Sequence, residues 1–340
     1  MRLSDLSTMR VGGAPRDVIE GDVVEEIIEA VTECDDLGQP VVILGEGSNV
    51  ICGDDVGDLT FLHIATRGIV IETHGDRALV NAAAGEDWDR FVVFCLDAGA
   101  AAMTPMSGIP GSVGATPIQN VGAYGVDVSA YIEGVHVWDR RDRDYRWMSN
   151  AECAFGYRTS VFKDDPDRYI VLEVRFALPA SQDVVVEHEQ LARALAVTVG
   201  SRVDGAHVRD SVLGLRRAKG MVLDPADPDS VSVGSFFVNP TVSDAAAAAL
   251  PAACPRFPAA PGWTKVSAAW LIENAGIERG FSLGSPARVS TKHVLAITNS
   301  GGASCADVVA LARHVRDAVR AQWSIELHPE PRLIGVSLDG

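Results

Sequence analysis

The segment from Gly108 to Gly125, GIPGSVGATPIQNVGAYG, constrains the fold of this chain more than any other stretch. Its glycines and prolines are Gly108, Gly111, Gly114, Gly122, Gly125, Pro110 and Pro117. Glycine adopts backbone conformations that other residues avoid and proline fixes φ, so the segment makes a poor helix or strand. The composition fits a rigid loop whose amides converge on an anion such as a diphosphate, and it fits a plain glycine-rich surface loop equally well.

Length and charge limit the classes of function. The chain has 340 residues and a formal net charge of −17, so we expect two or three domains and no attraction to nucleic acid or to an anionic membrane surface. The first ten residues lack an apolar signal region, and no apolar run approaches the roughly 20 residues that span a bilayer. These features predict a cytoplasmic protein without membrane insertion.

Cysteines and short motifs exclude several kinds of site. The six cysteines form no CxxC pair and no zinc-ligand spacing, so we expect reduced thiols and no metal. The dinucleotide fingerprint, the P-loop, the GxSxG elbow and the HExxH motif are all missing from the sequence. Lysine is scarce, because only four of the 29 basic residues are lysine: Lys163, Lys219, Lys265 and Lys292.

Hydrophobic periodicity predicts a mixture of short strands and helices. Helices are predicted over residues 22–37, 87–98, 208–217, 265–275 and 306–322. Strands are predicted over residues 41–44, 60–64, 68–72, 78–83, 132–138, 143–148, 169–178, 233–238 and 294–298. Residues 251–261 are predicted to be an exposed connection, and a domain boundary is expected near residues 200–225. The alternation of short strands with few helices is typical of an α+β fold.

Three side chains stand out as candidates for chemistry, each with a structural alternative. Arg158, in GYRTSVFK, can grip a carboxylate bidentately or form an ordinary ion pair. Ser235, beside two phenylalanines, can donate a proton in a dry pocket or bond its own backbone. Glu330 lies between two prolines on a stiff path, where it can serve the site or pair with Arg332 at the surface.

Together these pieces resemble the UDP-N-acetylenolpyruvoylglucosamine reductase (MurB) family over nearly the whole chain. The matching motifs are TMRVGG (8–13), LGEGSN (44–49), AGE (84–86), the glycine-rich segment (108–125), YRxSxFK (157–163), GSFFxNP (234–240), AWLIENAG (269–276) and PExR (329–332). The resemblance implies an α+β fold that begins with an FAD-binding module of the PCMH or vanillyl-alcohol-oxidase type. That module is expected over residues 1–200 as two α+β subdomains split near 65–75. An α+β substrate domain is expected over 201–325, and a tail over 326–340 returns Glu330 to the active site.

The resemblance also implies a reaction. The family reduces the enolpyruvyl group of UDP-N-acetylenolpyruvoylglucosamine to UDP-N-acetylmuramate, a cytoplasmic step of peptidoglycan synthesis that serves cell shape and division. NADPH is the expected reductant and N5 of FAD the expected hydride carrier. Arg158 matches the arginine that polarises the substrate carboxylate, Glu330 the glutamate that assists it, and Ser235 the proton donor. An FAD-dependent oxidase of the same fold and a non-catalytic flavin-binding paralogue are the alternatives.

The binding residues follow from the same resemblance. FAD is expected to bind non-covalently, because neither glycine-rich segment contains histidine, through Gly45, Glu46, Gly47, Ser48, Asn49, Gly108, Ile109, Pro110, Gly111, Ser112, Gly114, Ala115, Gln119, Asn120, Gly122, Ala123 and Tyr124. The UDP-sugar is expected to meet Tyr157, Lys219, Asn239, Asn274 and His188. His188 falls near the tyrosine that closes over the substrate in one class of the family, although a solvated loop histidine fits the same pattern. A monomer is expected.

Overall fold

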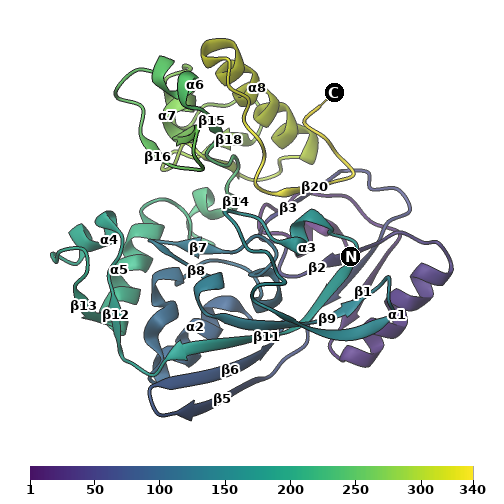
Figure 1. Ribbon diagram of the computed structural model, residues 1–340. Helices are drawn as coiled ribbons and strands as arrows, with labels where there is room; N and C mark the ends of the chain where they lie inside the picture. The colour runs from purple at the N-terminus through teal and green to yellow at the C-terminus, as the bar shows by residue number, and fades with distance from the viewer. Residues whose placement is uncertain (340) are drawn as a thin grey trace. The chain divides into compact units, whose positions relative to one another are not determined.

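The computed structural model describes residues 1–339, which form two compact units (Figure 1). The central unit consists of Pro15–Glu46 and Asp58–Ala218, and the terminal unit consists of Met1–Ala14, Gly47–Gly57 and the chain from Lys219 onward. Each unit combines helices with small sheets, so the predicted α+β class is confirmed.

These units differ from the predicted ranges 1–200, 201–325 and 326–340. Helix α5 (Gly205–Arg217) belongs to the central unit, because its Val208 and Val212 share a buried cluster with Leu191. The short segment 47–57 belongs to the terminal unit, since its strand β3 pairs in parallel with β20 near the C-terminus. Pairing over such a sequence distance leaves no local pattern in the sequence.

The central unit begins with a parallel sheet of strand order β1–β4–β2. Its elements are β1 (Asp17–Gly21), β2 (Val41–Leu44), β4 (Thr60–Ile64) and the helix α1 (Val24–Asp36). The apolar face of α1 buries Ile27 and Val31 in the same core as Leu62 and Ile64 of β4. The predicted helix 22–37 and strands 41–44 and 60–64 are thereby confirmed.

A five-stranded antiparallel sheet of order β10–β9–β11–β6–β5 forms the largest layer of the central unit (Figure 1). Its strands are β5 (Ile69–His74), β6 (Arg77–Ala83), β9 (Ile132–Asp139), β10 (Asp144–Ser149) and β11 (Tyr169–Pro179). Helix α2 (Trp88–Asp97) packs on it through Trp88 and Phe91, whose rings lie 6.3 and 4.9 Å from that of Phe176 on β11. These three rings are fully buried in the larger core.

Smaller elements complete the central unit. They are β7 (Gly122–Ala123), β8 (Val126–Asp127), α3 (Val161–Asp164), β12 (Asp183–Val185), α4 (Glu189–Ala194) and β13 (Arg202–Asp204). Strands β12 and β13 pair antiparallel beside α4 and α5, around a satellite core of aliphatic residues.

Up to residue 339, the terminal unit contains three small sheets and three α-helices. The sheets are β14–β19–β18, β15–β17–β16 and β20–β3. The strands are β3 (Val50–Cys52), β14 (Ser232–Ser235), β15 (Thr241–Ser243), β16 (Arg256–Pro258), β17 (Trp263–Val266), β18 (Ala287–Val289), β19 (Ala296–Asn299) and β20 (Arg332–Ile334). The helices are α6 (Asp244–Ala249), α7 (Ala268–Glu273) and α8 (Cys305–Trp323). No helix within residues 1–339 is both long and apolar enough to cross a membrane.

Two predictions of local structure in this unit are wrong. The predicted helix 265–275 is reduced to α7, because the residues just before it form strand β17. The predicted connection 251–261 contains β16, which pairs antiparallel with β17. A short apolar run fits strand and helix periodicity alike, so the sequence alone did not separate these cases.

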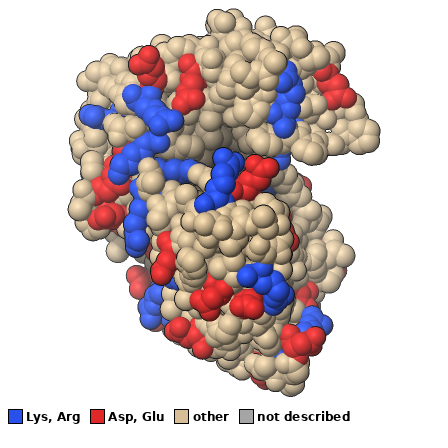
Figure 2. Space-filling view, turned by 90° about the vertical axis from the view of Figure 1, so that its left-hand side faces the viewer, with Lys and Arg blue, Asp and Glu red and all other residues tan. Residues whose placement is uncertain are grey.

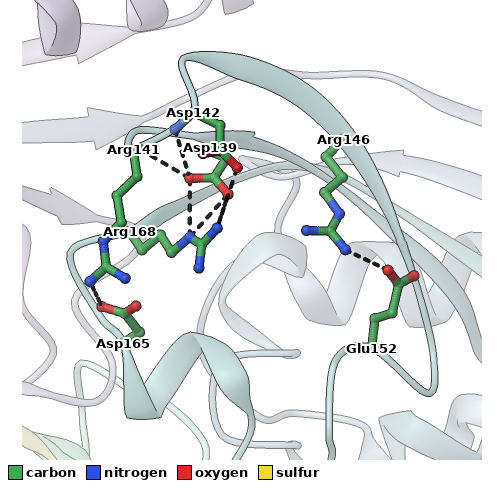
Figure 3. Close-up of polar contacts among 7 residues, drawn as sticks. All are labelled: Asp139, Arg141, Asp142, Arg146, Glu152, Asp165 and Arg168. Carbon is green, nitrogen blue, oxygen red and sulfur yellow. Dashed lines mark hydrogen bonds and ion pairs between the residues drawn. The ribbon is translucent and has the colours of Figure 1, made fainter.

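A network of ion pairs fixes the turn between β9 and β10 (Figure 3). The Asp139 side chain, 2% exposed, accepts hydrogen bonds from Arg168 Nη2 at 2.7 Å and from the amides of Arg141 and Asp142 at 3.0 and 3.4 Å. Burial raises the pKa of Asp139, but these hydrogen bonds outweigh burial and hold the pKa below its usual value. The turn is therefore pinned by a buried, charged carboxylate.

Replacing Arg168 with methionine should destabilise the protein by about 3–5 kcal/mol at pH 7, because Asp139 loses its charged partner while it stays buried. The lowered pKa of Asp139 stabilises the fold above the unfolded pKa of about 3.9, and this contribution is lost as pH falls through the folded pKa. The difference in free energy of unfolding between wild type and Arg168→Met should therefore become smaller below about pH 4. Urea unfolding at pH 7 and below about pH 4 measures this difference.

Asp142→Asn is the matched control, since Asp142 is 69% exposed and lies 3.5 Å from Arg168. It should change the free energy of unfolding by less than about 0.5 kcal/mol. Equal losses from the two substitutions would contradict this account of the turn.

Candidate functional site

The glycine-rich segment is an ordered loop held against the connection between β6 and α2. A 3-10 turn lies at its centre, over Val113–Ala115. The Val113 amide donates to the carbonyl of Glu86 at 2.8 Å, and the Gly114 amide donates to the carbonyl of Ala84 at 2.8 Å. These bonds fix the backbone of the loop to the core of the central unit.

Gly45, after strand β2, meets this loop. A Cβ at Gly45 would lie 2.5 Å from Oγ of Ser112 and 3.9 Å from Cβ of Ala115, and Ser112 itself is buried. The place has room for backbone alone, so the lack of a side chain at Gly45 lets the two segments pack closely together. Two of the predicted FAD-binding segments are thus side by side, and the residues present fit that cofactor.

Asp89 anchors the start of the loop, and sequence reasoning missed it. Its carboxylate accepts the amide of Gly108 at 2.6 Å and pairs with both Nη atoms of Arg209 at 2.6 and 2.7 Å. Burial raises the pKa of Asp89. The hydrogen bonds from Arg209 and Gly108 have the opposite and larger effect, so the pKa lies below its usual value. The only sequence signal was an acidic residue in the first turn of α2, which is common at helix N-termini.

Arg158 is held against the same loop. Its Nη2 donates to the carbonyl of Gly122 at 3.0 Å, and its Nη1 donates to that of Asn120 at 3.4 Å. Asn120 in turn donates from Nδ2 to the carbonyl of Gly156 at 3.1 Å. The guanidinium also lies 5.6 Å from the centre of the Tyr157 ring, which is exposed. The predicted catalytic arginine and the predicted cofactor loop therefore form one assembly.

The end of the loop contacts helix α4 and lies near α5. The Tyr124 ring meets the His188 ring edge-on at 5.6 Å, and His188 Nδ1 accepts the amide of Gln190 as the cap of α4. Burial lowers the pKa of Arg216 to about 10, against the opposing effects of Tyr124 and Asp89, so Arg216 is charged at neutral pH. His188 is thus an exposed helix cap beside the loop, which fits the alternative of a solvated histidine.

The terminal unit brings the backbones of Ser235 and Glu330 together. Ser235 ends strand β14, and the carbonyl of the next residue, Phe236, accepts the amide of Glu330 at 2.8 Å. Phe237 forms a bridge with Pro329 in the same pairing. Both phenylalanines are buried, so Ser235 lies at the edge of an apolar core. Two of the three predicted catalytic residues are therefore neighbours.

Asn49 belongs to the same place in the terminal unit. Its Nδ2 donates to the carbonyl of Glu330 at 3.4 Å, and its carbonyl accepts the amide of Arg332 at 3.0 Å. Gly47, two residues earlier, has φ +60 and a position at which a Cβ would collide with the carbonyl of Leu6. This predicted cofactor segment thus packs against Leu6 at Gly47 and against the tail at Asn49.

The predicted substrate residues of the terminal unit have mixed surroundings. Burial, followed by the charges of Lys219 and Arg279, lowers the pKa of His293 to about 4, so this histidine is neutral near pH 7. Sequence reasoning missed His293 and Arg279, which lie in no motif of recognised chemistry. Asn239 Oδ1 accepts the amide of Ala268 at 2.9 Å, which fixes the orientation of this side chain at the start of helix α7.

Asn274 is the most exposed of these side chains. It follows helix α7, and its Nδ2 donates to the carbonyl of Trp270 at 2.8 Å. That bond closes the end of the helix and gives no sign of a binding role.

The predicted site residues divide between the two units. The central unit carries Gly45, Glu46, Gly108, Ile109, Pro110, Gly111, Ser112, Gly114, Ala115, Gln119, Asn120, Gly122, Ala123, Tyr124, Tyr157, Arg158 and His188. The terminal unit carries Gly47, Ser48, Asn49, Lys219, Ser235, Asn239, Asn274 and Glu330. Over residues 1–339, no group of three or more His, Cys, Asp or Glu is arranged to hold a metal ion.

Basic side chains gather locally although the chain is acidic overall. Figure 2 shows groups of adjoining Lys and Arg side chains on one face of the molecule. In the central unit, Arg158, Arg209 and Arg216 all lie on or near the glycine-rich loop. Such local positive charge suits an anionic ligand despite the net charge of −17.

Two family models match this chain. A model described as FAD binding domain matches residues 15–144, and one described as UDP-N-acetylenolpyruvoylglucosamine reductase, C-terminal domain, matches residues 225–334. Together they cover most of the chain and agree with the order of the two predicted functional regions.

Relatives of known name match over almost the full length. The UDP-N-acetylenolpyruvoylglucosamine reductases of Cutibacterium acnes and Streptomyces coelicolor are each 47% identical over 99% of this chain and 90% of theirs. Among solved structures, the UDP-N-acetylenolpyruvylglucosamine reductase (MurB) of Thermus caldophilus has a TM-score of 0.64 at 22% identity, over 98% of this chain and 97% of that one. That structure supports the fold.

Replacing Gly45 with alanine should weaken FAD binding by about 10- to 100-fold, because the new methyl group displaces Ser112 from the loop. Titration of the apoprotein with FAD, followed by flavin fluorescence, gives the Kd. Gly214→Ala is the control, since Gly214 is exposed in helix α5 and no atom lies within 4 Å of its Cβ position. It should leave the Kd unchanged and raise stability by about 0.5–1 kcal/mol. An unchanged Kd in Gly45→Ala would exclude Gly45 from the cofactor site.

Proposed function

Because this chain belongs to the UDP-N-acetylenolpyruvoylglucosamine reductase family, we propose that it reduces the enolpyruvyl group of that UDP-sugar to form UDP-N-acetylmuramate. NADPH is the proposed reductant and non-covalently bound FAD the proposed cofactor. The product is a precursor of peptidoglycan, so the proposed place of action is the cytoplasm, where a monomer would suffice.

The observation that carries this proposal is the pairing of the Ser235 strand with the Glu330 tail. The bond from the Glu330 amide to the Phe236 carbonyl, at 2.8 Å, ties a candidate proton donor to a candidate carboxylate partner. A flavin oxidase of the same fold has no need for these two residues together with Arg158. Their joint presence favours reduction of an alkene that bears a carboxylate.

Arg158 and Glu330 would act on the substrate carboxylate. FAD, when bound, supplies a hydride acceptor and donor between NADPH and the alkene. Addition of hydride to the terminal alkene carbon leaves negative charge on the carbon beside the carboxylate, as an enolate. A guanidinium stabilises that charge through paired N–H donors, and fixed donors of this kind are most effective where water is excluded. Glu330 is proposed to assist Arg158 in stabilising this charge.

Ser235 would supply the proton that completes the reduction. A serine hydroxyl is a very weak acid, but an enolate that resembles a carbanion is a strong base, so the transfer can be downhill. The next two residues, Phe236 and Phe237, are buried, which agrees with a serine at the edge of an apolar core.

The sugar nucleotide is proposed to be held by the polar side chains that the family resemblance assigns to it. Lys219 and the amide nitrogen of Asn239 are proposed to meet the diphosphate, and Asn274 a neighbouring part of the nucleotide. Tyr157 and His188 are proposed to contact the substrate from the central unit. The backbone near Gly45 and Ser112 is proposed to hold the diphosphate of FAD, and the anchored loop beside it supports that assignment.

The test of the proposed function is NADPH oxidation by purified protein, with and without UDP-N-acetylenolpyruvoylglucosamine. A flavin spectrum with oxidation that depends on the substrate supports the proposal, and formation of UDP-N-acetylmuramate completes it. Oxidation that needs only oxygen would identify an oxidase. Bound flavin without turnover would identify a non-catalytic paralogue.

Ser235→Ala should separate the two half-reactions. Flavin reduction by NADPH should stay within about twofold of wild type, whereas reoxidation by the substrate should slow by about 10²- to 10⁴-fold, the usual effect of losing a proton donor. Anaerobic stopped-flow absorbance measures both steps.

Ser243→Ala is the control, because Ser243 caps helix α6 in the same unit and its hydroxyl has no part in the proposed chemistry. It should lower stability by about 1 kcal/mol and leave both rates unchanged. Unchanged reoxidation in Ser235→Ala would remove this serine from the mechanism.

A further inference from the structure

The backbone of Arg158 is in an unusual conformation. Its φ is +55, in the left-handed region that residues other than glycine rarely adopt. It lies in a tight turn in which the Gly156 amide donates to the carbonyl of Thr159 at 3.0 Å. Strain of this kind persists only where neighbouring contacts impose it, and such residues cluster at functional sites.

The strained backbone directs the guanidinium onto the glycine-rich loop. Its bonds to the carbonyls of Gly122 and Asn120, at 3.0 and 3.4 Å, require the side chain to leave the turn in that direction. A relaxed backbone at Arg158 would move the side chain off these carbonyls, because φ sets the direction in which Cβ points.

Lys163 contacts the peptide that follows this strained residue. Its Nζ donates to the carbonyl oxygen of Arg158 at 2.9 Å, so a charged donor fixes the plane of that peptide. Charged donors make hydrogen bonds roughly twice as strong as neutral ones. An ammonium is a compact charge suited to a single carbonyl, whereas a guanidinium is a fork suited to a carboxylate. This chain uses arginine almost everywhere, yet it has one of its four lysines here.

Lys163 is itself fixed relative to the loop. It lies in the short helix α3, which Ser160 caps by accepting the amides of Phe162 and Lys163 on its Oγ. The same hydroxyl donates to the carbonyl of Ile118 at 2.6 Å. The glycine-rich loop therefore fixes helix α3, which carries Lys163. Lys163 in turn hydrogen-bonds to the carbonyl of Arg158.

We propose that Lys163 is a positioning residue, whose ammonium keeps Arg158 in its left-handed conformation and so aims the guanidinium at the substrate carboxylate. The proposal rests on the proposed function, in which Arg158 meets that carboxylate. In this proposal Lys163 acts through Arg158 and not by contact with the substrate or the cofactor.

The test compares Lys163→Met with wild type and with Lys163→Arg in the FAD-loaded enzyme. Methionine keeps the length of the side chain and removes its charged donor. Flavin reduction by NADPH should stay within about twofold, while reoxidation by the substrate should slow by about 10- to 100-fold, as expected when a reacting group is displaced by about 1 Å. Lys163→Arg keeps a charged donor and should recover part of the rate.

A double-mutant cycle separates positioning from general stability. In an Arg158→Met background, Lys163→Met should add less than about twofold to the loss, because coupled residues are not additive. The same further loss in both backgrounds would show that Lys163 acts through the fold as a whole. Full activity of Lys163→Met would also overturn the proposal.

A crystal structure of Lys163→Met gives a readout that does not depend on turnover. The proposal predicts that φ of Arg158 leaves the left-handed region, or that the guanidinium leaves the Gly122 carbonyl. Unchanged geometry at Arg158 would overturn the proposal. Failure of the proposed function is distinct, since wild type would then show no oxidation of NADPH that depends on the substrate.

Discussion

The backbone bonds that fix the glycine-rich loop are the constraint on which the central unit's site depends. The loop is tied at its start by Asp89, at its middle by the carbonyls of Ala84 and Glu86, and near its end by Arg158. A loop with so many glycines would otherwise be costly to order, because glycine loses the most conformational freedom on folding. Held in this way, its main chain is rigid before any ligand arrives, which lowers the entropy cost of binding.

The candidate catalytic residues are positioned by two different kinds of interaction. In the terminal unit, main-chain pairing brings the Ser235 strand and the Glu330 tail together, so the position of each depends on regular hydrogen bonds. In the central unit, Arg158 has a left-handed backbone, and its carbonyl accepts a hydrogen bond from the side chain of Lys163. The position of Arg158 is therefore expected to be more sensitive to single substitutions, because loss of the one side-chain donor would let its strained backbone relax.

Local structure was largely predictable where periodicity is strong. The helix near Ile27, the hairpin of β9 and β10, and helix α8 follow from apolar spacing and turn residues alone. The pairing of β3 with β20 was not predictable, since nothing near Ile51 in the sequence refers to Leu333. Strand β17 was missed because four residues before a helix are too few for periodicity to decide.

The candidate site shows the same division. Arg158, Ser235 and Glu330 are predicted from motifs that resemble a known family, and their catalytic roles stay predictions. The close approach of Gly45 to Ser112 agrees with the predicted proximity of two cofactor segments. The residues that hold the site in place, Asp89 and Arg209 above all, carry no motif and act through geometry that only folding creates.

The most direct measurement of the central claim is a crystal structure with FAD and the enolpyruvyl substrate bound. The account predicts the FAD diphosphate against the backbone of Gly45 and Ser112 and the substrate carboxylate on Arg158. A diphosphate bound elsewhere, or a carboxylate remote from Arg158, would contradict it.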